Sequence, residues 1–137
     1  MTRVTRRYRF AASHRLHSAE RSEAENSELY GKCNNPYGHG HDYILEVGVR
    51  GQIDGSTGRV VNPLALDEFV RAAVLNVFDH KDMNRDVDSF RDVVPTTENL
   101  SLDVERRLRE GWCFAAAELD RIKLQETKRN SFELKGL

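Results

Sequence analysis

Hydrophobic and polar residues alternate along two long segments of the chain, a pattern typical of β-strands with one buried face. Over residues 3–15, one face is formed by Val4, Tyr8, Phe10, Ala12 and His14. The opposite face carries mainly arginine and hydroxyl side chains. Over about 39–52, the apolar face is formed by His39, His41, Tyr43, Leu45, Val47 and Val49. Histidines therefore extend the apolar face of both predicted strands.

Two later segments have apolar residues at helical spacing. Asn62 and Pro63 suit the N-cap and first position of a helix that continues to about residue 78. A second helix begins near "TTEN", where Thr96 or Thr97 can act as the N-cap and Glu98 lies in the first turn. Residues 18–30 are acidic and are predicted to be irregular or partly helical, and the polar residues 79–95 are predicted to form a long loop.

Shorter strands are predicted around the two helices. The turn-rich "IDGSTGR" followed by "RVVN" predicts a hairpin that returns at 59–62. Two more strands are predicted at about 118–127 and 131–135. In the first of these, Glu126 shares the face of Ile122 and Leu124, and a carboxylate there needs a partner because unpaired burial is costly. The element order predicts an α+β domain over residues 1–137, with an antiparallel sheet and helices on one face.

Composition and charge exclude some classes of function. The formal net charge is -1, so the chain lacks the basic field that holds nucleic acid. No run of about 18 apolar residues could span a membrane, and the first residues do not resemble a signal peptide. We therefore expect a cytoplasmic protein with two free thiols, Cys33 and Cys113. The apolar setting "GWCFAAA" predicts that Cys113 is buried.

The histidines of the two strands suggest a metal site. Residues two apart on a strand point to the same side, so His39 and His41 can converge on one ion. His14 ends the first strand on its apolar face and is able to supply a third imidazole. Such nitrogen ligands favour zinc, and three of them leave a fourth position for water or substrate. His17 has the opposite parity to His14, and we expect an exposed structural role for it.

Cys33 has two possible roles in "GKCNNPYGHGH". As a fourth ligand it would close a structural Cys-His-His-His site. As a thiol beside an open metal site, with its pKa lowered by positive charge and by Lys32, it would supply a thiolate base or nucleophile. Asp79 and His80, just after the first helix, offer a carboxylate and an imidazole for proton transfer.

In combination, "ASHRLH", "GKCNNPYGHGH", "DHKDMN", "PTTEN" and "LQET" resemble the 6-pyruvoyl-tetrahydropterin synthase family over nearly the whole chain. The resemblance implies the tunnelling fold (ββααββ), in which a four-stranded antiparallel sheet carries two helices on one face. It also implies that subunits join their sheets into trimeric barrels, commonly stacked as a homohexamer. The implied reaction is the zinc-dependent conversion of 7,8-dihydroneopterin triphosphate to 6-pyruvoyl-tetrahydropterin, with elimination of triphosphate.

The resemblance also implies roles for individual residues. His14, His39 and His41 match the zinc ligands. Cys33 matches the proton acceptor, and Asp79 with His80 match the partners of its relay, which need not come from the same chain. Glu126 matches the carboxylate that grips the pterin, and Thr96, Thr97 and Glu98 match a region that also holds the pterin ring.

Two other functions are consistent with parts of the pattern. The sister enzyme, 6-carboxy-tetrahydropterin synthase of the queuosine pathway, shares the fold, the zinc and the substrate, but its cysteine usually lies closer to the His-Gly-His, with three intervening residues. Here Asn34 to Gly38 make a longer spacer, which favours the pyruvoyl reaction. The other alternative is a non-catalytic zinc-stabilised binding module that uses Cys33 as its fourth ligand.

Overall fold

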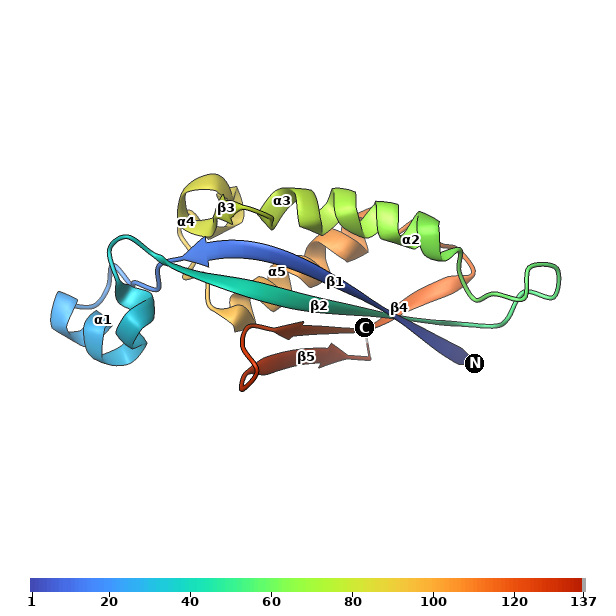
Figure 1. Cartoon of the computed structure of the whole chain (residues 1–137), viewed down its shortest axis with the longest axis horizontal. Helices are drawn as coiled ribbons and strands as arrows, with labels where there is room; N and C mark the ends of the chain where they lie inside the picture. The colour runs from blue at the N-terminus through green and yellow to red at the C-terminus, as the bar shows by residue number, and fades with distance from the viewer. Residues whose placement is uncertain (137) are drawn as a thin grey trace.

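The computed structural model describes residues 1–136, and its long strands form a twisted sheet with helices packed on one face (Figure 1). The strands are β1 (Thr2–His14), β2 (His39–Gly51), β3 (Lys81–Asp82), β4 (Ala117–Gln125) and β5 (Ser131–Lys135). They form a five-stranded sheet in the order β3-β1-β2-β4-β5. The four long strands are antiparallel, and the short β3 pairs in parallel with the end of β1.

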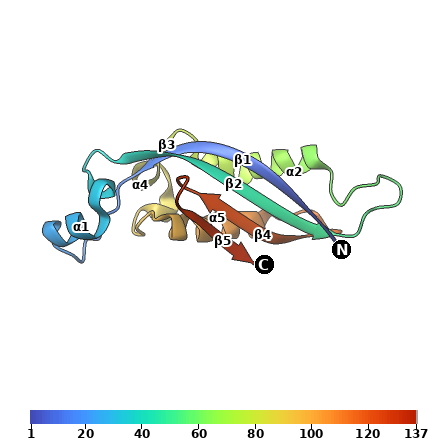
Figure 2. The ribbon, with the colours of Figure 1, turned by 60° about the horizontal axis from the view of Figure 1, so that its bottom comes forward.

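The helical segments are α1 (Glu23–Tyr30), η1 (Gly31–Asn34), α2 (Pro63–Val70), η2 (Arg71–Leu75), α3 (Asn76–Phe78), α4 (Met83–Asp86), η3 (Asp88–Phe90) and α5 (Thr97–Gly111). The first predicted helix is present as α2, η2 and α3, with a π-helical turn in its middle. Asn62 caps it as predicted, because its side chain accepts from the backbone N–H groups of Leu64 and Ala65. Figure 2 shows this helix and α5 behind the sheet, on the same face.

The core lies between the sheet and these helices. The helices contribute the buried side chains of Leu66, Val70, Val74, Phe78, Leu100, Val104 and Leu108. The strands contribute Phe10, Tyr43, Leu45, Val47, Val49, Ile122 and Leu124, among others. Burying a large apolar side chain is worth about 1.5–3 kcal/mol, so this layer strongly specifies which face of each strand points inward. The predicted parity of the long strands is confirmed, and the α+β architecture agrees with the tunnelling fold.

Three expectations about the fold are wrong. Residues 59–62 form no strand, because β1 and β4 occupy the two edges of β2 and leave none for a hairpin partner. The segment 79–95 is more than a loop, since it contains β3, α4 and η3, and β3 adds a fifth strand to the expected four. Cys113 is exposed, because its neighbours Trp112 and Phe114 turn inward and pack against Phe69.

The acidic segment before β2 forms α1, which lies beyond the end of the sheet where β1 ends and β2 begins (Figure 1). Ser22 caps α1, and Glu25 completes the capping box by accepting from the backbone of Ser22. The helix leads directly into η1, which carries Cys33. None of the helices within residues 1–136 is long and apolar enough to cross a membrane.

Candidate metal centre and active site

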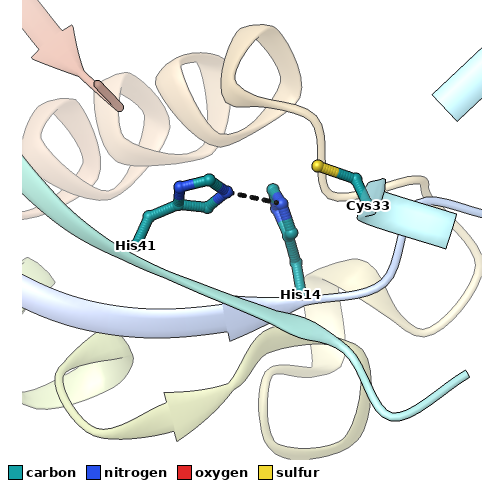
Figure 3. A group of neighbouring side chains, drawn as sticks. All are labelled: His14, Cys33 and His41. Carbon is teal, nitrogen blue, oxygen red and sulfur yellow. Dashed lines mark hydrogen bonds between the residues drawn. The ribbon is translucent and has the colours of Figure 1, made fainter. Parts of the chain in front are cut away.

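Side chains from three segments meet at this end of the sheet: His14 from β1, Cys33 from η1 and His41 from β2 (Figure 3). One ligand atom of each residue lies within 4.8 Å of the others. Antiparallel pairing places His14 opposite His39 and Ala12 opposite His41, so the histidines share one face of the ladder. Figure 3 shows the sulfur of Cys33 pointing toward His14. The predicted convergence of His14 and His41 is therefore present in the structure.

The hydrogen bonding of His14 fixes the tautomer that a metal ligand requires. It is 1% exposed, and its Nδ1 lies 2.9 Å from the carbonyl oxygen of Pro95. A carbonyl only accepts, so Nδ1 donates this bond and the neutral ring keeps its lone pair on Nε2. That Nε2 atom lies 3.2 Å from Nε2 of His41. Two nitrogens bound to one tetrahedral zinc at about 2.0–2.1 Å lie about 3.3 Å apart, so the pair fits a shared ion.

Both imidazoles are biased toward the neutral form, in which histidine binds metals. Burial lowers the pKa of His14, and the nearby ring of His41 lowers it further. Burial also lowers the pKa of His41, although the carboxylate of Glu126 acts in the opposite direction. The donor set, its spacing and its protonation thus fit a metal ion such as zinc.

His39 lies beside this group but is not among its three members. It is exposed at the first position of β2, and its ring centroid is 4.6 Å from that of His41. Cys33 occupies the place in the cluster that the sequence predicted for His39. The role of His39 as the third nitrogen ligand stays a prediction.

The surroundings of Cys33 in the metal-free chain favour the protonated thiol. Burial raises the pKa of its thiol, and the negative charge of Glu126 raises it further. The expectation that Lys32 lowers this pKa is wrong, because Lys32 is exposed and the nearest charge acting on the thiol is negative. Without a cation, the thiol stays protonated at neutral pH.

Glu126 lies next to the cluster, as its parity predicts. Its Oε1 atom is 4.0 Å from Nε2 of His41, and its Oε2 atom accepts a hydrogen bond from the hydroxyl of Thr97. Thr97 is buried at the start of α5, whereas Thr96 is the N-cap of that helix. Glu98 is exposed in the first turn. The structure therefore brings Thr97 to Glu126, gives Thr96 a capping role and leaves Glu98 facing solvent.

Asp79 and His80 lie at the other edge of β1, where β3 begins. The backbone N–H of Ala11 donates to Asp79 at 2.9 Å, and the N–H of His80 donates to the carbonyl of Ala11 at 2.6 Å. His80 has a φ of 59° and a side chain that is 84% exposed. It lines an open cavity of about 560 Å³ together with residues 11–13 and 40–42, and Cys33 is outside that lining. His80 therefore lines a cavity that does not include the thiol.

Sequence reasoning missed several groups that shape the site. Tyr43, whose hydroxyl is 3.4 Å from Nδ1 of His14, has the parity of His41 and could have been found from it. The carbonyl of Pro95 and the amides of Asn34 and Asn84 left no such signal, because their partners are distant in sequence. His17 is half-buried rather than exposed as expected, and its Nδ1 lies 3.1 Å from the side-chain nitrogen of Asn34.

Comparison with known proteins supports these observations. The family model described as 6-pyruvoyl tetrahydropterin synthase matches residues 3–136. The chain is 44% identical to the 6-pyruvoyl tetrahydrobiopterin synthase of Poecilia reticulata and 43% identical to that of Homo sapiens. These alignments cover 97% of this chain and 89% and 90% of those proteins. The structure of Caenorhabditis elegans 6-pyruvoyl tetrahydropterin synthase matches with a TM-score of 0.90 at 35% identity, over 99% of this chain and 96% of that one.

Proposed function

Since this chain belongs to the 6-pyruvoyl tetrahydropterin synthase family of enzymes, we propose that it converts 7,8-dihydroneopterin triphosphate into 6-pyruvoyl-tetrahydropterin. The reaction eliminates triphosphate and moves hydrogens within the substrate, as a step of tetrahydrobiopterin-type pterin biosynthesis. The observation that carries the proposal is the convergence of a possible metal site, a thiol and a partly buried carboxylate at one end of the sheet.

We propose zinc as the metal, because imidazole nitrogens beside a thiol are donors that it prefers. His14 and His41 would hold it, and the neighbouring His39 would supply the third nitrogen. When bound, zinc acts as a Lewis acid toward side-chain oxygens of the substrate and acidifies the adjacent C–H bond. Three protein ligands leave a position for those oxygens.

Cys33 is the proposed acceptor of the substrate proton. Its thiol is half-buried and its pKa is raised by burial and by Glu126, so the thiolate depends on the positive charge of a nearby metal. This requirement couples the base to an occupied metal site. In the alternative of a structural site, the same sulfur would instead be a permanent ligand.

Glu126 is the proposed anchor for the pterin. A carboxylate accepts two parallel hydrogen bonds from the guanidine-like edge of an amino-pyrimidine, which fixes the register of the ring. The hydroxyl of Thr97 already donates to one carboxylate oxygen and orients it. Thr96 and Glu98, from the same turn, complete the proposed binding region. The partly buried setting of Glu126 strengthens these bonds relative to water.

We propose that a second copy of the chain supplies Asp79 and His80 to the Cys33 site. His80 is exposed, and it lines a cavity that does not include Cys33. Both outer edges of the described sheet are also open, since β3 covers β1 only at Ala12 and Ser13 and β5 is the last strand. Open strand edges favour pairing with another chain. Joining these edges would build the trimeric barrels, and two barrels the homohexamer, that the family resemblance implies.

Both cysteines are free thiols, which suits the reducing cytoplasm, the compartment in which we propose that the enzyme acts. The substrate is a small pterin triphosphate, and the near-zero net charge argues against nucleic acid as a partner.

A product assay tests the proposed reaction. Purified, zinc-loaded protein is incubated with 7,8-dihydroneopterin triphosphate, and triphosphate, acetaldehyde and the pterin product are quantified. The expected result is triphosphate release with a 6-pyruvoyl product and no acetaldehyde. Acetaldehyde with a carboxylated pterin would instead identify 6-carboxy-tetrahydropterin synthase activity, and no turnover would contradict both.

A further inference from the structure

Cys33 differs from the two clustered histidines in how it is held. His14 and His41 lie on neighbouring strands whose register is set by a continuous ladder. Cys33 lies outside the sheet, in the short 3-10 turn η1. Something other than the ladder must therefore fix the distance between its sulfur and the histidines.

Hydrogen bonds connect this turn to the three residues that follow His14. The backbone N–H of Leu16 donates to the carbonyl of Cys33 at 2.6 Å. The side-chain amide of Asn34 donates to the carbonyl of Leu16 at 2.7 Å, and Nε of Arg15 donates to the carbonyl of Asn34 at 3.1 Å. On the other side, the amide of Asn84 makes two bonds to the backbone of Arg15, at 2.7 and 3.0 Å.

The orientation of the Asn34 amide follows from its partners. The Leu16 carbonyl can only accept, so the amide atom facing it is the nitrogen. The same nitrogen lies 3.1 Å from Nδ1 of His17, which must then accept, and the neutral ring of His17 carries its proton on Nε2. One side chain therefore holds both Leu16 and His17, directly after the histidine strand and next to the thiol.

We propose that Asn34 is a positioning residue, whose side-chain amide fixes the η1 turn so that the Cys33 sulfur faces the His14–His41 pair. Asn35, its neighbour, provides the contrast. Among residues 1–136, the side-chain oxygen of Asn35 accepts only from the N–H of Tyr37 within the same loop. Loss of the Asn34 amide removes its two bonds to the segment after β1 and loosens the thiol-bearing turn, although the bonds from Leu16 and Arg15 to that turn remain. Loss of the Asn35 amide leaves all of these bonds intact.

The test compares Asn34→Ala and Asn34→Asp with Asn35→Ala, all in a Cys113→Ser background so that Cys33 is the one remaining thiol. Asn34→Asp keeps the size of the side chain but removes both donated bonds, and it covers the case in which Asn34→Ala does not fold. The first readout is the rate of iodoacetamide alkylation of Cys33 in metal-free protein. We expect it to rise at least about threefold in the Asn34 variants, because the turn opens more often, and to be unchanged in Asn35→Ala.

The second readout is the rate of the same alkylation in Co²⁺-loaded protein, in which the ion at the histidines lies close to the thiol. We expect bound Co²⁺ to change the alkylation rate of Cys33 less in the Asn34 variants than in Asn35→Ala, because their thiol no longer faces the ion. A variant that merely destabilised the fold would lower the melting temperature without changing either readout below that temperature. Alkylation rates equal to those of Asn35→Ala, both without metal and with Co²⁺ bound, would overturn the proposal.

The catalytic consequence rests on the proposed function. If Cys33 is the base, kcat falls about ten- to a hundredfold in the Asn34 variants with little change in KM, since a displacement of about 1 Å is enough for such a loss. If Cys33→Ser keeps full activity, the proposed base is wrong, but the alkylation rates still decide whether Asn34 positions the thiol.

Discussion

The Nε2 atoms of His14 and His41 lie 3.2 Å apart, although 27 residues separate the two histidines along the chain. The antiparallel pairing of β1 with β2 brings them to one face. The carbonyl of Pro95 holds the Nδ1 proton of His14 and so frees its Nε2 atom to face His41. The two candidate ligand atoms of the metal site are therefore already in place in the folded chain.

Replacing His14 or His41 by Ala should remove the metal. We expect zinc affinity to fall by more than about a hundredfold, because even hydrogen-bond partners of metal ligands contribute about 10–100-fold. Metal content measured by mass spectrometry and competition with a chromophoric chelator would check this. His80→Ala is the matched control and should keep one zinc per chain. Full zinc occupancy in His14→Ala would contradict the site.

Cys33→Ala separates the catalytic from the structural role of the thiol. A base beside an open metal site predicts a folded protein with normal zinc content and a kcat at least about a hundredfold lower, within the range of about 10²–10⁴ for acid–base groups. Cys113→Ser, at an exposed position after α5, should leave activity unchanged. If Cys33→Ala lost its zinc together with its fold, the thiol would be a structural ligand.

Glu126→Gln should weaken substrate binding more than it changes zinc content. The amide keeps the size of the carboxylate but replaces one of its two accepting oxygens with an NH₂ group. That group can only donate, whereas Thr97 and the pterin edge both offer donors. Hydrogen bonds to charged groups are worth about 1.5–3 kcal/mol, so we expect the Kd for a pterin ligand to rise about ten- to a hundredfold. Calorimetric titration of the zinc-loaded protein measures it, and an unchanged Kd would move the pterin site elsewhere.

Mixing two inactive variants tests whether the site is shared between chains. Cys33→Ala and His80→Ala are unfolded together in equal amounts and refolded into mixed oligomers. If one chain provides the thiol and its neighbour the imidazole, random mixing leaves about a quarter of the sites intact, and about a quarter of the parental activity returns. Each variant refolded alone is the control. Failure of the mixture to recover activity would place both groups in one chain.

The pH dependence of stability is predicted from Asp103, which is buried on α5. Burial would raise the pKa of Asp103, but hydrogen bonds from Arg107 and Arg106 outweigh it and hold this pKa below its ordinary value. The carboxylate therefore contributes stability that is present above the unfolded pKa of about 3.9 and is lost as the pH falls through the lower, folded pKa.

We expect Asp103→Asn to lower the free energy of unfolding by about 1–3 kcal/mol at pH 7. The difference from the parent protein should shrink as the pH is lowered below about 4. Urea denaturation at a series of pH values measures both. A difference that stays constant down to the acid limit would show that the ion pairs with Arg106 and Arg107 contribute nothing to stability.

Local periodicity was enough to predict the faces of the long strands. A strand alternates its side chains with a period of two regardless of what it packs against. For that reason His14, His41 and Glu126 could be placed on the apolar faces of their strands, and Asn62 could be recognised as a helix cap from the residues beside it. For the second helix the sequence offered Thr96 or Thr97, and the structure has Thr96.

Properties that depend on distant partners could not be read in the same way. The hairpin expected at 59–62 failed because β4, from the far end of the chain, pairs with that edge of β2. The expected effect of Lys32 on Cys33 failed because Glu126 is the charge nearby in space.

The sequence by itself determined the strand and helix pattern, the inward-facing histidines and the motifs of the family, because these depend on neighbours along the chain. Only the tertiary structure decided that Cys33 joins the two histidines, that the Pro95 carbonyl sets the tautomer of His14, and that Asn34 connects the thiol-bearing turn to the segment after β1. Such contacts form when chain folding brings distant segments together, so the local periodicity of the sequence does not indicate them.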